Sequence, residues 1–186
     1  MGLELITPPI AEPVSLAEAK VHLRVDSDEE DALIEGYIRA ATRYVEKGLD
    51  ISLMERTWKM TLDAFTRAIE LPRGPVQSVT SVEYIDPLGV TVAFTDYTAD
   101  LISPSQWIVL NKDATIPTTL DAVNVVSVTY VSGFDVLPNV YEDLKHAILL
   151  LVGHWYSVRE SVSDKVMAEV PLSVDALIYP YRTILV

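Results

Sequence analysis

The spacing of apolar residues changes twice along the chain. Between residues 28 and 47, apolar side chains recur at every third or fourth position, which is the spacing of one face of an α-helix. Between residues 57 and 64 they alternate with polar ones, which is the spacing of a β-strand. Helical spacing returns after residue 139. The pattern therefore predicts an α+β fold: a small helical bundle with an antiparallel β-module inserted between its second and third helices.

This pattern also predicts the organisation of the chain. We expect residues 1–54 to form the N-terminal helices of the bundle and residues 55–135 to form the inserted β-module. Residues 136–186 would then supply the C-terminal helices and a docking tail. No internal repeat and no low-complexity stretch interrupts this order.

Three helix starts carry a capping residue followed three positions later by Glu. In such a box the short side chain accepts from a free backbone N–H, and the Glu reaches back to the cap. The pairs are Ser15 with Glu18, Ser27 with Glu30, and Asn139 with Glu142. They predict helices over Leu16–Leu23, from Asp28 to Lys47 with Gly48 as the C′ residue, and from Val140 to Arg159. A fourth, short helix fits Ser173–Tyr179, ended by Pro180.

The third predicted helix is apolar on more than one face. One side carries Leu144, Ala147, Ile148, Leu151, Val152 and Trp155, and another carries Leu149, Leu150 and Tyr156. A helix that is apolar nearly all round must be covered nearly all round. It is either the central helix of the core or a core helix that also meets a neighbouring subunit.

The middle of the chain predicts short, β-branched strands. Val76–Ile85 is ended by the turn Asp86–Gly89, and Val90–Phe94 would return as its hairpin partner. Further strands are expected at Gln106–Leu110 and Val123–Val131. Their lengths favour a small antiparallel sheet or sandwich.

Charge and composition narrow the classes of function. The 186 residues include 14 Lys+Arg against 27 Asp+Glu, a net charge of −13, and no cysteine. An acidic surface offers DNA no phosphate contacts, so we expect DNA at most to slide past it. The absence of cysteine excludes disulfides and thiolate chemistry. No apolar stretch approaches the roughly 20 residues of a membrane span. The hydrophobic fraction of 49% allows either a large core or apolar surface that is buried on assembly.

Candidate chemical motifs lead to no site. The acidic run Asp28, Glu29, Glu30 and Asp31 lacks the Gly and the bidentate Glu of a calcium loop, and acids at a helix start suit the helix dipole. His146 and His154 lie about 12 Å apart along a helix, too far to share a metal, and His22 has no accompanying pattern. Nucleophile-elbow, Walker and dinucleotide motifs are absent. We therefore expect no catalytic residue, no metal and no cofactor.

The C-terminus is unusually apolar. Chain ends are usually polar and frayed, but this one carries Ile184, Leu185 and Val186 after Pro180. Such a tail either folds over its own bundle or adds to another protein as an extended segment. For the second case the candidate contact residues are Tyr179, Tyr181, Arg182, Ile184, Leu185 and Val186.

The order of these segments resembles the head–tail connector (adaptor, or head-completion) proteins of tailed bacteriophages, in the branch with a β-insert. The resemblance rests on helix caps and core patterns over nearly the whole chain, and residues 95–123 match least. The matching stretches are ITPPIAEPVSLAEAKVHLRVD (6–26), EDALIEGYIRAATRYVE (30–46), RTWKMTLD (56–63), IELPRGPVQSVTSVEYID (69–86), VTYVSGF (128–134), LKHAILLLVGHWYSVRE (144–160) and VPLSVDALIYPYR (170–182).

The resemblance implies a structural protein without enzymatic activity. Such proteins form a ring, typically of twelve copies, beneath the portal at the capsid vertex of the virion. The ring joins the portal to the next neck, stopper or tail protein and lets DNA pass, and phage-derived gene transfer particles use similar proteins. On this reading the protein is made in the host cytoplasm and acts in the neck. The acids at Asp28, Glu29, Glu30 and Asp31 would face the bore, and the C-terminal residues would bind the portal.

Two other functions remain open from the residues alone. One is a carbohydrate- or peptide-binding β-module with helical flanks, for which Trp58, Trp107 and Trp155 could supply an aromatic platform. The other is a hydrolase with a pair of carboxylates, since the chain holds 27 acids.

Overall fold

The fold was analysed in a computed structural model, which describes residues 1–158 and 172–182. The chain divides into two compact units. The β unit comprises Met1–Ile10 and Ile51–Asp135, and the helical unit comprises Ala11–Asp50 and Val136–Val186. Both sheets are antiparallel, and all their strands except β1 lie between the second and third helices in the sequence, so the expected α+β class is confirmed.

The unit boundaries differ from the expected ranges in two places. The β unit ends at Asp135, where the expected range also ends, but it begins at Ile51 rather than at residue 55. It also contains residues 1–10, which we had assigned to the helical bundle. The reason is an edge strand, β1 (Gly2–Thr7), which pairs antiparallel with β2 (Arg56–Leu62).

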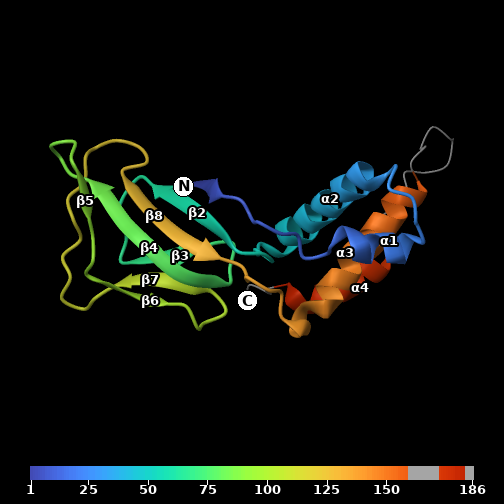
Figure 1. The fold of residues 1–186 in the computed structure, drawn as a ribbon. Helices are drawn as coiled ribbons and strands as arrows, with labels where there is room; N and C mark the ends of the chain where they lie inside the picture. The colour runs from blue at the N-terminus through green and yellow to red at the C-terminus, as the bar shows by residue number, and fades with distance from the viewer. Residues whose placement is uncertain (159–171, 183–186) are drawn as a thin grey trace. The chain divides into compact units, whose positions relative to one another are not determined.

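The larger sheet of the β unit has five strands in the order β1-β2-β8-β4-β5 (Figure 1). Its remaining strands are β4 (Val76–Ile85), β5 (Thr91–Ala93) and β8 (Val126–Ser132). Strand β4 matches its predicted range, and its turn is closed by a hydrogen bond from the Gly89 N–H to the Asp86 carbonyl (2.9 Å). The predicted hairpin partner at 90–94 and the strands predicted at 57–64 and 123–131 therefore form, with ends shifted by one to three residues.

The smaller sheet has three strands in the order β3-β7-β6. They are β3 (Ala68–Leu71), β6 (Tyr97–Asp100) and β7 (Gln106–Leu110). Only β7 was predicted. Strands β3 and β6 have four residues each and lack a β-branched run, so their pairing with β7 decides their conformation.

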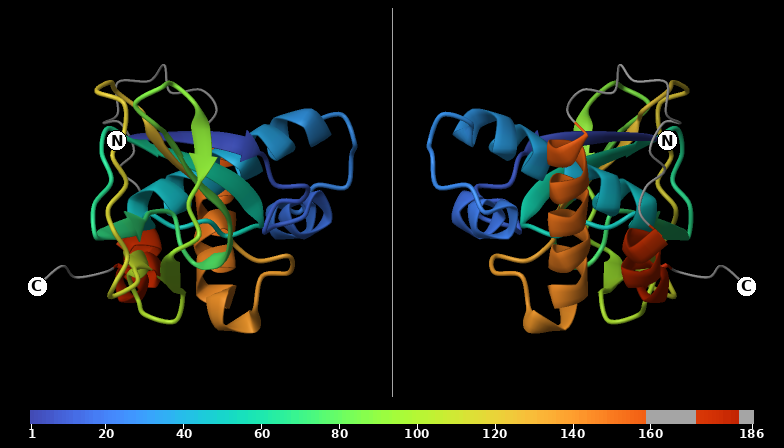
Figure 2. Two further views of the ribbon diagram at one scale, coloured as in Figure 1. Left: turned by 90° about the vertical axis from the view of Figure 1, so that its left-hand side faces the viewer. Right: turned by 90° about the vertical axis from the view of Figure 1, so that its right-hand side faces the viewer.

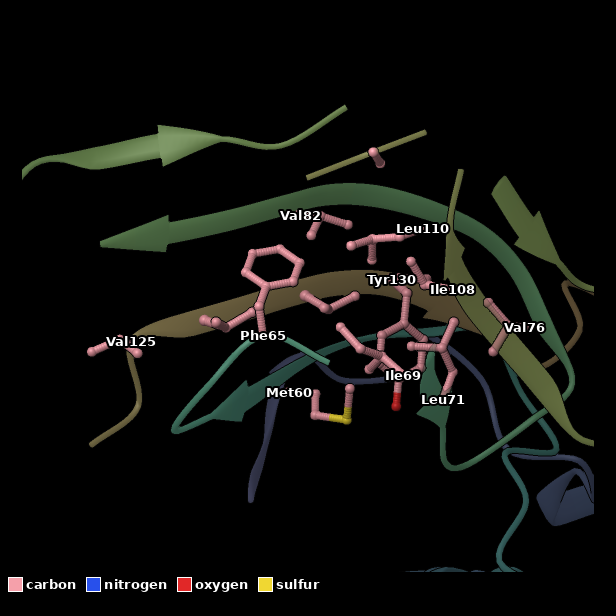
Figure 3. Close-up of a cluster of buried hydrophobic side chains, with 13 residues drawn as sticks. Met60, Phe65, Ile69, Leu71, Val76, Val82, Ile108, Leu110, Val125 and Tyr130 are labelled. Carbon is pink, nitrogen blue, oxygen red and sulfur yellow. The ribbon is translucent and has the colours of Figure 1, made fainter. Parts of the chain in front are cut away.

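The core of the β unit lies between the two sheets. Strand β2 places Trp58, Met60 and Leu62 opposite residues 130, 128 and 126 of β8, so alternate positions face inward. Ile69, Leu71, Ile108 and Leu110 come from the smaller sheet (Figure 3). Tyr130 is fully buried, and its hydroxyl donates to the Pro72 carbonyl (2.7 Å). The module is a small sandwich, one of the two architectures predicted.

The helical unit contains α1 (Leu16–Leu23), α2 (Asp31–Leu49), α3 (Glu142–Ser157) and α4 (Leu172–Ile178). Helix α3 lies between α1 and α4 (Figure 2) and also packs against α2. The inner side of α3 is fully buried at Leu144, Ala147, Ile148, Leu151 and Val152. Leu149, Leu150, Trp155 and Tyr156 are half-buried, so the second apolar face is only partly covered within the chain.

One of the three predicted capping boxes forms. The Ser15 hydroxyl accepts from the Glu18 N–H, and the Glu18 carboxylate accepts from the Ser15 N–H. The box at Ser27 is wrong: this hydroxyl accepts from the Glu29 N–H, and α2 begins three residues later than expected. The box at Asn139 is also wrong. Here a 3₁₀ turn, Asn139–Tyr141, precedes α3, so Asn139 lies before the cap position.

Two helix ends also differ from the prediction. Helix α2 continues through Gly48 to Leu49, whose side chain is buried, and Asp50 takes the left-handed conformation (φ 55°). Helix α4 ends at Ile178, and Pro180 lies inside a 3₁₀ turn, Tyr179–Tyr181. The predicted end of the third helix at Arg159 lies outside the described residues.

Candidate partner-binding surfaces

The capping box of α1 is tied to α3 by an ion pair. The Glu18 carboxylate accepts from the Ser15 N–H (2.8 Å) and hydroxyl (2.7 Å), and its other oxygen accepts from Lys145 Nζ (2.9 Å). The Ser15 N–H, followed by Lys145, lowers the pKa of Glu18 to about 2. The same contact raises the pKa of Lys145. Glu18 therefore keeps its charge at every physiological pH and fixes the start of α1 against α3.

A surface groove, which we call the α1–α3 seam, follows the line between these two helices. One hollow of about 480 Å³ is lined by the apolar residues Ala17, Val21 and Leu149 and by the polar residues Glu18, Glu142, Lys145 and His146. A second hollow of about 650 Å³ is lined by Leu23, Leu150, Gly153, His154 and Tyr156. His22 lines both hollows, and together the two hollows follow α3 from Glu142 to Ser157. Val21, an apolar residue, is 79% exposed in this groove.

The seam brings together all three histidines of the chain. His146 borders one hollow, His154 borders the other, and His22 lies between them. The sequence had shown no relationship for His22, because its neighbours on α3 are more than 120 positions away. Gly153 permits the approach, since a Cβ there would come 3.3 Å from His22 Nε2. Within residues 1–158 and 172–182, no three His, Asp or Glu side chains are grouped closely enough to hold a metal ion.

The acidic residues before α2 are largely bound by groups of the helical unit. Lys20 Nζ forms ion pairs with Asp28 and Asp31, the second at 2.8 Å. This ammonium lowers the pKa of Asp28, and the two carboxylates raise the pKa of Lys20. Glu30 accepts a hydrogen bond from the Tyr156 hydroxyl of α3. Asp28 and Glu29 are the two exposed members of the predicted bore-facing set.

The outward side of α2 carries two parallel rows of side chains, which we call the α2 outer face. One row is apolar and only partly covered: Leu33 and Tyr44 are each 40% exposed, and Ala40 lies between them. The other row is basic and consists of Arg39, Arg43 and Lys47, all exposed. Arg39 pairs with Glu35 at 3.5 Å. The i, i+4, i+8 spacing of the basic row is visible in the sequence, but we had not singled it out.

The C-terminal candidates divide into exposed and internally bound residues. Tyr179 is 63% exposed. Tyr181 packs on Tyr141 with ring centroids 5.7 Å apart, and burial together with Asp143 raises the pKa of its hydroxyl. Arg182 pairs with Asp175 of α4 at 3.0 Å. Ile184, Leu185 and Val186 lie outside the described residues. Of the three described members of this set, Tyr179 and Arg182 are exposed, Arg182 with an internal ion pair, and Tyr181 is half-buried.

Two of the three tryptophans are held by contacts within their own unit. Trp58 is half-buried, and its Nε1–H donates to the Ser52 hydroxyl (3.1 Å). Trp155 packs on Tyr37 of α2 with ring centroids 6.4 Å apart. In the described part of the chain, no helix has the length and apolarity that crossing a membrane requires.

Comparison with known proteins agrees with the resemblance found in the sequence. Residues 13–85 match the family model of phage gp6-like head–tail connector proteins. No curated protein matches the chain. Three similar solved chains come from gene transfer agent (GTA) particles, and each alignment covers 100% of this chain and 97% of the other. They are from the neck of an empty particle with C6 symmetry (26% identity, TM-score 0.82), a native virion (25%, 0.80) and the neck of a native particle with C12 symmetry (25%, 0.78).

Proposed function

We propose that this chain is a head–tail connector protein of the gp6-like family and serves as a structural adaptor in the neck of a tailed phage or of a phage-like gene transfer particle. The observation that carries the proposal is the match over the whole chain to chains of GTA necks. The helical segment alone could recur in unrelated proteins, but here the β unit and both helical segments match together. The role is structural: surfaces rather than a reaction centre define it.

In this role the protein works as a ring. The C6 and C12 symmetries of the matching necks support a ring oligomer, and we propose twelve copies. The ring would join the portal on one side to the next neck, stopper or tail protein on the other. DNA would pass through its bore, which the net charge of −13 favours because it offers few phosphate contacts. Asp28 and Glu29, the exposed acids before α2, are the residues we propose to border the bore.

The portal contact is proposed at the C-terminal end. Tyr179 is an exposed aromatic residue after α4, and Ile184, Leu185 and Val186 form an apolar end to the sequence. Aromatic and aliphatic anchors of this kind contribute most of the free energy at many protein interfaces. Arg182 contributes less directly, because its guanidinium already pairs with Asp175.

Deletion of the gene in the producing strain tests the proposed function. Without the adaptor, filled heads and separate tails should accumulate, and electron microscopy should show heads without necks. Expression of the wild-type chain from a plasmid should restore joined particles. Native mass spectrometry of purified necks should give a ring of about 250 kDa, as expected for twelve copies of a 20.6 kDa chain. Complete necks and tails in the deletion strain would contradict the proposal.

A further inference from the structure

In a closed ring of identical chains, every copy contacts two neighbours. Cyclic symmetry above two-fold uses heterologous contacts, in which one surface of a copy meets a different surface of the next copy. The matching necks have C6 and C12 symmetry. Each chain of such a ring must therefore carry two distinct and complementary surfaces.

The α2 outer face has the composition of one such surface. Its apolar row remains partly exposed, although it runs beside the buried side of the same helix. This row consists of Leu33, Ala40 and Tyr44. The basic row beside it carries three positive charges in a chain whose net charge is −13. A surface that combines apolar and basic side chains fits a partner that is apolar and acidic.

The α1–α3 seam has the complementary composition. Its lining includes the apolar residues Ala17, Val21 and Leu149, and the half-buried face of α3 continues this apolar surface. Carboxylates stand at both ends: Glu18 and Glu142 at the start of α3, and Glu30, held by Tyr156, near its end. Lys145 pairs with the first two and offsets one of these charges.

The two surfaces also agree in length. From Leu33 to Lys47 the α2 outer face spans 14 residues, about 21 Å at 1.5 Å per residue. From Glu142 to Tyr156 the seam follows α3 over the same number of residues and hence the same length. The exposed rows of α2 therefore match in length the face of α3 that lines the seam.

From this match of shape, charge and length we infer that the α2 outer face of one copy packs along the α1–α3 seam of the next copy in the ring. The inference rests on the proposed function, because it assigns the surfaces by which the ring closes. A second copy explains both rows of the α2 outer face. DNA would contact the basic row but would leave Leu33 and Tyr44 exposed to water, since phosphates are bound by cations and hydrogen-bond donors.

The absence of cysteine makes this contact directly measurable by cross-linking. We would combine Val21→Cys with Ala40→Cys, assemble rings or particles, oxidise them, and separate the chains without reductant. Because the two positions meet only between copies, the double variant should give a ladder from dimer to higher oligomers. After oxidation, either single variant should give only single chains in this separation, because it forms no disulfide between copies. The matched control combines Val21→Cys with Glu35→Cys, which lies on the same helix about 140° around the axis from Ala40.

Charge reversal gives a second, independent readout. Arg39→Glu with Arg43→Glu should raise the protein concentration needed for ring assembly about tenfold or more, since it places carboxylates against Glu18 and Glu142. Arg67→Glu with Lys112→Glu, two exposed cations of the β unit, makes the same change in net charge and should assemble like wild type.

The outcomes separate this inference from the proposed function. If the Val21→Cys, Ala40→Cys variant forms rings of normal mass but no cross-linked ladder, the assigned surfaces are wrong. They are also wrong if the control with Glu35→Cys gives a ladder of equal yield. In both cases the adaptor role stands. The same holds if the charge-reversed protein assembles normally and loses only DNA retention. A wild-type chain that forms no ring in particles would contradict the adaptor role itself, and with it this contact.

Discussion

Gly133 lies directly against the backbone of Met54. A Cβ on Gly133 would overlap the Met54 carbonyl and come 3.0 Å from the Glu55 nitrogen. The backbone of Gly133 is left-handed (φ 88°), and its N–H donates to the Pro75 carbonyl (2.9 Å). This close approach joins the end of β8 to the segment that enters β2, so glycine is required here on two independent grounds.

We predict that Gly133→Ala lowers the free energy of unfolding by more than about 2 kcal/mol, because both the backbone conformation and the packing oppose a side chain. The matched control is Gly89→Ala. Gly89 is also left-handed (φ 82°), but a Cβ there would meet nothing within 4 Å. Gly89→Ala should therefore lower the free energy of unfolding by only about 1 kcal/mol. Equal losses for both variants in urea unfolding would show that crowding at Met54 does not matter.

The ion pair between Glu18 and Lys145 makes a prediction about pH. Glu18→Gln should lower the free energy of unfolding by about 1 kcal/mol at pH 7, the usual cost of damaging an N-cap. The folded-state pKa of Glu18 is about 2, below its ordinary value of 4.5. The stabilisation is therefore fully present above pH 4.5 and is lost as the pH falls through about 2. The difference between variant and wild type should shrink over that range.

Glu29→Gln is the control for this titration. It removes the same charge from an exposed carboxylate, whose side chain makes no hydrogen bond or ion pair in the described part of the chain. Its stability curve should follow that of wild type from pH 7 to pH 2. A Glu18→Gln curve that also follows wild type would mean that the capping box contributes nothing measurable.

The two faces of α3 should respond differently to truncation. Ile148 is fully buried, so Ile148→Ala should cost about 2–5 kcal/mol in the isolated protein. Leu149 is half-buried in the seam, and Leu149→Ala should cost about 1 kcal/mol or less. For ring assembly we expect the opposite order: Leu149→Ala should weaken assembly more than its small effect on stability suggests, because Leu149 lies on the surface that we assign to contact with the neighbouring copy. Thermal melts and ring mass, measured on the same samples, distinguish the two effects.

The sequence predicted what depends on near neighbours. The Ser15–Glu18 box closes within one helical turn, and α1 has its predicted bounds. Strands β4 and β7 were also predicted with their observed ends, because each presents its own run of β-branched or apolar residues. In these segments the local preference and the tertiary structure agree.

The errors arise where distant groups decide the conformation. At Ser27 the expected cap is lost while Lys20 of α1 binds Asp28 and Asp31, and α2 begins later. Strand β1 depends on pairing with residues 50 to 59 positions away, which no local pattern shows. The α1–α3 seam depends in the same way on Gly153 admitting His22. The basic row on α2, in contrast, could have been found from its spacing.

The C-terminal tail either covers its own bundle or binds the portal, and a deletion distinguishes the two. Deletion of Thr183–Val186 should leave the melting temperature nearly unchanged and abolish attachment to portal-bearing heads. An apolar end that serves another protein contributes nothing to the isolated chain. A truncated protein that melts well below wild type yet still attaches when folded would place the tail in its own core.

Two tyrosines provide the matched pair for this test. Tyr181 packs on Tyr141 within the helical unit, so Tyr181→Ala should lower the melting temperature. Tyr179 is 63% exposed, so Tyr179→Ala should leave stability unchanged and weaken attachment to heads. Attachment is measured by mixing the purified variant with adaptor-free heads and counting joined particles by electron microscopy. If Tyr179→Ala attaches like wild type while the deletion variant does not, the contact lies wholly within residues 183–186. The prediction that Tyr179 anchors the contact is then wrong.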